Sequence, residues 1–229
     1  MTEIVPAVLA ENFQDLNEKI AKYENIVSSI QIDVCDGNFV PSTSWPVHSS
    51  DEESIQKILN EEDGMPYWDK IDFEFDLMVK NAHTQFEFFV RLGAKKIIFH
   101  LEAEDDLVTF KEFLEGLDIY FKENIEIALA INTTTPIDSL EPFINNIDFV
   151  QCMGIEKIGF QGENFDDRVL NQIRDLRMKY PELIISVDGG VNENTAPLLI
   201  KAGANRLVIG SVLKNSLDIR ETINYFENL

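Results

Sequence analysis

The sequence predicts a (β/α)8 barrel that forms a single domain over residues 1–229. Eight short runs rich in Val, Ile, Leu and Phe recur along the chain, and helical patterns separate them. Most runs are nearly continuous rather than alternating, which is typical of parallel strands covered on both faces. A chain of 229 residues also has the length of one such barrel. An open doubly wound sheet is the alternative, but it does not normally need eight regularly spaced strands in so short a chain.

The expected elements alternate in order along the chain. We expect strands at residues 4–10, 29–34, 70–79, 95–101, 125–131, 147–153, 183–189 and 206–211. We expect helices at residues 11–24, 82–92, 104–117, 136–146, 164–180, 192–203 and 216–227, most of them opened by Asn, Asp or Thr-Pro caps. The one long connection, residues 38–69, carries the helix-like stretch "DEESIQKILNEE". Long connections in compact domains are often functional lids, so we expect this one to serve the site.

The charge of the chain excludes several kinds of partner. Asp and Glu number 41 against 19 Lys and Arg, which gives a formal charge of −22. Such a chain repels nucleic acid and anionic membrane surfaces. The opening "MTEIVPAVLAENF" does not have the pattern of a secretory signal, and no uncharged run approaches the roughly 20 residues of a membrane span. We therefore expect a cytoplasmic protein whose two cysteines, Cys35 and Cys152, are reduced core residues.

Polar residues stand at the ends of the expected strands, where (β/α)8 barrels carry their reactive groups. They are Gln31, Asp33, Asp76, His100, Glu102, Asn132 and Asp188. Asp33 and Asp188 come from different strands and could face one another across the mouth of a barrel. Two such carboxylates could take a proton from one face of a bound carbon and return one to the other face, provided that one starts protonated. The alternative is that each is an ordinary loop carboxylate.

Glycines follow the last three expected strands. They lie in "GFQG" (159–162), "DGG" (188–190) and "GS" (210–211). Each motif alone indicates only a tight turn, but loops at these positions of a barrel commonly bind phosphate through backbone N–H groups. With a net charge of −22, a phosphorylated ligand has to be held by close donors rather than by long-range attraction.

These motifs together resemble the ribulose-phosphate 3-epimerase family. The resemblance covers nearly every strand end and includes "IDVCDGNFVP" (32–41), "FDLMVKN" (75–81), "GFQGENF" (159–165), "ISVDGGVNENT" (185–195) and "AGANRLVIGS" (202–211). It implies a barrel that interconverts ribulose 5-phosphate and xylulose 5-phosphate with Asp33 and Asp188 as the catalytic acid and base. It further implies substrate and phosphate contacts at Gly162, Gly189, Gly190, Gly210, Ser211, Met78 and Met153. Cys35 replaces a third pocket methionine.

The chain departs from this family at the metal ligands. Family members bind a divalent metal through two histidines and the two catalytic aspartates, and here Gln31 and Asp76 stand at the histidine positions. Oxygen ligands from Gln31, Asp33, Asp76 and Asp188 favour magnesium or manganese over zinc. The alternative is a metal-free site in which mutual repulsion keeps one aspartate protonated.

The function expected from these observations is epimerisation at C3 of a pentulose 5-phosphate through an enediolate. One alternative is a non-catalytic or repurposed barrel that binds a sugar phosphate, and another is a Schiff-base aldolase that uses Lys157. The expected partner is a phosphorylated sugar, with no nucleic acid and no membrane, and with a homo-oligomer of unspecified size. We expect His100 to support the site rather than to bind metal, and His48 and His83 to lie on the surface.

Overall fold

The computed structural model describes residues 2–47 and 51–229, and His48 lies outside this range. Its parallel strands follow the order of a closed barrel, β1 to β8 in sequence, which confirms the predicted fold class. The chain divides into two compact units. One unit is Ala7–Ile127, and the other joins the start of the chain up to Pro6 to Ala128–Leu229. The assignment of residues 1–229 to one domain stays a prediction.

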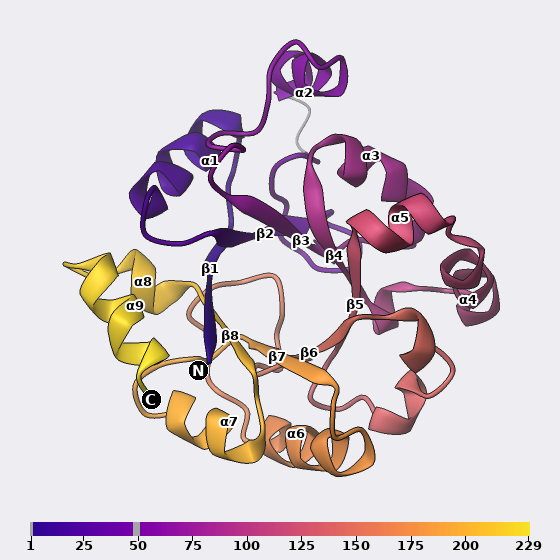
Figure 1. Cartoon of the computed structure of the whole chain (residues 1–229), viewed down its shortest axis with the longest axis vertical. Coiled ribbons are helices and arrows are strands. Elements are labelled where there is room, and N and C mark those ends of the chain that lie inside the picture. Colours follow the sequence, from indigo (N-terminus) through magenta and orange to yellow (C-terminus); the bar gives the residue numbers. More distant parts are fainter. Residues whose placement is uncertain (1, 48–50) are drawn as a thin grey trace. The chain divides into compact units, whose positions relative to one another are not determined.

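The unit Ala7–Ile127 contains three complete strands that lie side by side (Figure 1). Its strands are β2 (Ser29–Cys35), β3 (Asp72–Met78) and β4 (Ala94–His100), and its helices are α1 (Phe13–Ile20), α2 (Glu52–Leu59), α3 (Phe86–Arg91), α4 (Leu107–Gly116) and α5 (Ile119–Asn124). Three helices, α1, α4 and α5, are capped at their N-termini by the side chains of Asn12, Asp106 and Asp118. Each of these side chains accepts a hydrogen bond from a backbone N–H in the first turn. Such caps satisfy donors that a helix leaves unpaired.

The second unit contains the last strands, with α6 and α7 packed next to each other (Figure 1). Its elements are β6 (Phe149–Met153), β7 (Ile184–Asp188), β8 (Arg206–Ile209), α6 (Arg168–Lys179), α7 (Ala196–Ala202), α8 (Ser211–Lys214) and α9 (Ile219–Glu227). The strands β1 (Glu3–Val8) and β5 (Glu126–Ile131) cross the boundaries of the units. Buried Arg206 bonds to Glu3 and lies 4.7 Å from the centre of the Phe149 ring, so its charge is compensated.

All eight predicted strands are present, with ends that differ by at most two residues. The predicted helix at 136–146 is wrong: this segment forms two short 3-10 helices, η5 (Ile137–Leu140) and η6 (Ile144–Asn146). Pro142 lies between them and cannot donate the backbone hydrogen bond that a continuous helix needs. The helices α5 and α8 were not predicted, because each is short and follows another element closely. In the part of the chain that the structure describes, no helix has the length and apolar character needed to span a membrane.

The loops after β6 and β7 approach each other so closely that a glycine is required. The N–H of Gly154 donates to the carbonyl of Asp188 at 2.6 Å. A Cβ atom at Gly154 would lie 2.1 Å from the carbonyl oxygen of Gly189. Because that obstacle is backbone rather than a flexible side chain, one of the two loops would have to move.

We therefore expect Gly154→Ala to lower the free energy of unfolding by about 2 kcal/mol or more, the cost typical of an overpacked core. The matched control is Gly116→Ala at the end of α4, where a Cβ meets nothing within 4 Å. Urea unfolding of both variants checks this. Equal midpoints for the two variants would contradict it.

Candidate active site

Two acidic side chains stand next to each other near the carboxyl ends of β2 and β3. The parallel register pairs Asp33 with Asp76, so that both side chains point to the same face of the sheet. Asp33 is 7% exposed and Asp76 is fully buried. Carboxylate oxygens of the two residues lie within 4.8 Å of each other. The strand register thus places two carboxyl groups in one buried environment.

This environment makes Asp33 hold its proton more tightly. Burial, with a further contribution from the charge of Asp76, raises the pKa of Asp33 from 3.8 to about 7. Gln31 acts in the opposite direction, because its side-chain amide donates to a carboxylate oxygen of Asp33 at 2.9 Å. At neutral pH the Asp33 carboxyl is therefore present in both protonation states, which suits a group that exchanges protons.

His100, the last residue of β4, fixes the second carboxylate. Its Nε2 lies 2.9 Å from Oδ1 of Asp76, and both side chains are fully buried. The ring of Phe39, from the connection after β2, contacts the His100 ring with centres 5.6 Å apart. This position agrees with a supporting role for His100. Phe39 brings the early part of the long connection next to His100, and the lid role of that connection stays a prediction.

Ser44 holds the end of β2 in place, and the sequence analysis missed it. Its hydroxyl donates to the carbonyl of Asp33 and accepts the N–H of Cys35. Ser44 is fully buried. The only signal in the sequence is the stretch "PSTSW" (41–45), whose Pro and Ser residues are typical of turns. Cys35 is buried, as predicted, and burial raises the pKa of its thiol to about 12.

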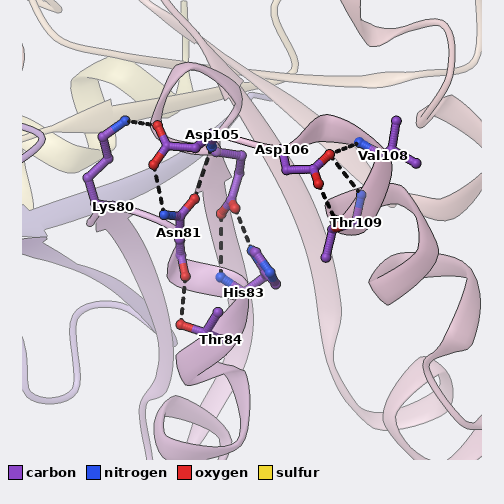
Figure 2. A network of polar contacts seen from close by, with 9 residues as sticks. Lys80, Asn81, His83, Thr84, Asp105, Asp106, Val108 and Thr109 are labelled. Atoms are coloured by element: carbon purple, nitrogen blue, oxygen red, sulfur yellow. Dashed lines mark hydrogen bonds and ion pairs between the residues drawn. The ribbon is translucent and has the colours of Figure 1, made fainter.

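The loops after β3 and β4 are tied together by the polar network in Figure 2. Lys80 forms an ion pair with Asp105, and the Asn81 side chain both donates to Asp105 and accepts its backbone N–H. His83 bonds to Glu104, whose pKa is raised by burial. The prediction of a surface position for His83 is wrong: its side chain is 13% exposed and contacts aromatic rings. This network braces the segments that follow Asp76 and His100.

Most of the remaining predicted residues belong to the second unit. Asp188 ends β7 and is half-buried, and the register places it beside Met153 of β6. Three predicted phosphate-binding glycines, Gly162, Gly189 and Gly190, have φ values of 85°, 94° and 69°. These conformations favour glycine, and a Cβ atom at Gly189 or Gly190 would also lie about 3 Å or less from Ile155 or Phe165.

The other predicted positions of that unit differ in exposure. Gly210 and Ser211 form the start of α8 and are half-buried, as is Asn132 after β5. Lys157, the candidate Schiff-base lysine, is exposed in the loop after β6. A Schiff-base lysine becomes reactive when it is desolvated or lies next to another cation. Because Lys157 is exposed, it is not desolvated. In the other unit, Glu102 is half-buried in the short helix after β4, and Met78 is buried at the end of β3.

The carboxylates of β2 and β3 fit a hard divalent cation. Oδ2 of Asp76 is buried and has no hydrogen-bond partner among the described residues, although its other oxygen is held by His100. A buried carboxylate oxygen without a partner is costly unless a cation or proton satisfies it. Because the donors are oxygens, magnesium, manganese or calcium suits them better than zinc.

A barrel strand order with buried carboxylates near the strand ends defines the class of (β/α)8 enzymes. Residues 3–214 match the ribulose-phosphate 3 epimerase family, and the chain belongs to this family. It is thus an epimerase-type enzyme that acts on carbohydrates.

Individual proteins agree with this membership. Ribulose-phosphate 3-epimerase of Eremothecium gossypii is 31% identical over 98% of this chain and 91% of its own length. Ribulose-phosphate 3-epimerase of Bacillus subtilis is 29% identical over 98% of this chain and 97% of its own. The crystal structure of 3-hexulose-6-phosphate synthase from Salmonella typhimurium has a TM-score of 0.67 at 12% identity and covers 100% of this chain and 97% of that one. This last likeness shows the fold.

The raised pKa of Asp33 gives a prediction for the metal-free protein. The folded state binds the proton with a pKa of about 7, against 3.8 for the ordinary group. The free energy of unfolding should therefore fall as the pH rises between these values, by on the order of a few kcal/mol, and level off above. Urea unfolding in a chelator at a series of pH values measures this slope.

Asp33→Asn should remove that slope, because the amide does not titrate. Asp72→Asn, at the exposed start of β3, is the matched control and should keep it. An unchanged slope in Asp33→Asn would show that another group is responsible.

Proposed function

We propose that the protein epimerises C3 of a pentulose 5-phosphate, interconverting D-ribulose 5-phosphate and D-xylulose 5-phosphate. The observation that carries the proposal is the buried Asp33 carboxyl near the end of β2, with its pKa near 7, in a chain of this family. The relatives from Eremothecium gossypii and Bacillus subtilis are named for this reaction.

In the proposed mechanism Asp33 and Asp188 work on opposite faces of C3. One carboxylate removes the C3 proton, which leaves an enediolate, and the other carboxyl group returns a proton from the opposite side. This needs one group to start protonated, and the raised pKa of Asp33 supports such a state at neutral pH. His100 keeps the neighbouring Asp76 from rotating, through its bond to Oδ1.

We propose that Asp33, Asp76 and Asp188 hold a divalent cation, magnesium or manganese rather than zinc. When bound, the cation supplies positive charge that stabilises negative charge developing on the substrate oxygens. Gln31 orients Asp33 through its amide donor, and its assignment as a ligand stays a prediction.

The phosphate of the substrate is assigned to the glycine loops of the second unit. The positive φ values of Gly162, Gly189 and Gly190, together with the start of α8 at Gly210 and Ser211, support this assignment. Met78 and Met153 are proposed to line the sugar pocket, since each is the buried last residue of its strand.

We also propose that the protein acts in the cytoplasm as a homo-oligomer. The Oryza sativa relative is named a cytoplasmic isoform.

Purified protein with ribulose 5-phosphate and Mg²⁺ or Mn²⁺ in D₂O should incorporate deuterium at C3, measured by NMR. Asp33→Asn and Asp188→Asn should each lower the exchange rate by about 10²-fold or more, because each removes a proton-transfer group. Asp72→Asn, at the other end of β3, should exchange normally.

Absence of exchange with either metal would refute the epimerase proposal. If ribulose 5-phosphate then still protected the protein against thermal unfolding, the non-catalytic binding alternative would be favoured. Trapping of a substrate adduct on Lys157 by borohydride would instead favour the aldolase alternative.

The proposed metal preference gives a separate prediction. Metal-free protein should gain thermal stability from Mg²⁺ or Mn²⁺ at lower concentrations than from Zn²⁺, whereas Asp76→His should shift this preference toward Zn²⁺, because imidazole suits zinc. Calorimetric titration of each metal into both proteins measures the two affinities. A preference for Zn²⁺ in the unchanged protein would contradict the proposed ligand set.

A further inference from the structure

A cavity of about 590 Å³ lies at the end of β3 opposite to Asp76. It is bounded by the end of α2, the connection 60–71, and the segment between α3 and β4, all within the unit Ala7–Ile127. Its volume is within the range of small-molecule sites. Since Asp72 begins β3 and lines the cavity while Asp76 stands near the other end of the strand, the cavity is separate from the candidate active site.

The floor of the cavity is apolar and one wall is an exposed indole. The floor side chains are all buried: Ile58, Met65, Ile71, Phe73 and Leu92. Trp68, by contrast, is 70% exposed. A large aromatic side chain left in water beside a buried apolar floor is unusual, because covering it would release free energy.

Gly64 supports the position of the indole. A Cβ atom built on Gly64 would lie 2.7 Å from Cδ1 of Trp68, so the ring rests against backbone that carries no side chain. The backbone N–H of Trp68 donates to the carbonyl of Met65, which closes the same turn. The indole is therefore held against this turn beside the cavity and is not packed into the core.

The rim of the cavity is mainly acidic. Four carboxylates line it, against two cationic side chains: Glu61, Glu62, Asp63 and Asp72, with Arg91 and Lys95. The Arg91 guanidinium is already engaged with the carbonyl of Leu59. The whole chain has a charge of −22, so the long-range field also attracts cations and repels anions.

We propose that this cavity is a binding site for a small organic cation with an apolar body, such as an alkylammonium compound. The apolar part occupies the floor, the charged head lies against the face of Trp68, and the carboxylates of the rim complement its charge. An indole is the best aromatic partner for a cation. No chemistry at the cavity is implied, and the site is independent of the epimerase proposal.

The two tryptophans make the site easy to observe. Trp45 is fully buried and Trp68 is exposed, so a ligand in the cavity changes the emission of Trp68 while Trp45 serves as an internal reference. Hexyltrimethylammonium should give a saturable change in fluorescence, and calorimetry should give the same Kd. Hexanoate and hexanol, which have the same apolar chain, should bind at least about tenfold more weakly. Equal binding of the three probes, or no saturable binding of the cation, would overturn the proposal.

Variants test each wall of the cavity by calorimetry. Trp68→Ala should weaken binding of hexyltrimethylammonium by about tenfold. Gly64→Ala, which displaces the indole without removing it, should weaken binding as well, whereas the matched Gly116→Ala should not.

A second set of variants tests the acidic rim. The double variant Glu62→Gln with Asp63→Asn should weaken binding by about threefold. The control double variant, Glu112→Gln on α4 with Glu123→Gln on α5, should leave binding unchanged. If the cavity variants and their controls behave alike, the assignment to this cavity is wrong.

A second probe separates a free cation from one carried by a protein. N-acetyl-arginine amide presents the cation as a peptide would. Weaker binding than that of hexyltrimethylammonium supports a small molecule. Tighter binding would assign the cavity to a protein segment and overturn the small-molecule proposal. C3 exchange of ribulose 5-phosphate, measured in the same variants, reports on the other end of β3 and keeps the two proposals distinguishable.

Discussion

The candidate site depends on one constraint, the register between β2 and β3. It sets Asp33 directly beside Asp76, and burial together with the charge of Asp76 raises the pKa of Asp33. Neighbouring side chains form hydrogen bonds with the two carboxyl groups. Gln31 donates to Asp33, His100 holds one oxygen of Asp76, and the other Asp76 oxygen has no hydrogen-bond partner among the described residues.

The same constraint bears on the proposed cation site. We propose that its oxygen donors, in place of the imidazoles that the family resemblance implies at the positions of Gln31 and Asp76, favour magnesium or manganese. The raised pKa of Asp33 results from burial together with the charge of Asp76. In this proposal, the cation preference of the site and the proton affinity of Asp33 depend on one pair of neighbouring residues.

The supporting structure lies in the loops. Ser44 fastens the end of β2, and the network from Lys80 to Glu104 braces the segments after β3 and β4. At the other end of β3, Trp68 is 70% exposed and stands beside acidic side chains that line a cavity. The two proposed sites thus lie at opposite ends of β3, the catalytic one near Asp76 and the binding cavity near Asp72.

The sequence by itself determined the strands, the barrel class and the candidate carboxylates, because near-continuous apolar runs and strand-end motifs are local patterns. It was wrong at 136–146, where Pro142 interrupts a helical pattern. It was also wrong for His83, which is partly covered by aromatic rings distant in sequence. Only the tertiary structure decided that His100 forms a hydrogen bond with Asp76 and that the Ser44 hydroxyl donates to the carbonyl of Asp33 in β2. It also decided that Trp68 is exposed beside a cavity. The bond between His100 and Asp76 joins two different strands. The contacts of Ser44 and the exposure of Trp68 depend on how their loops fold back against the strands, which the apolar pattern of the sequence does not encode.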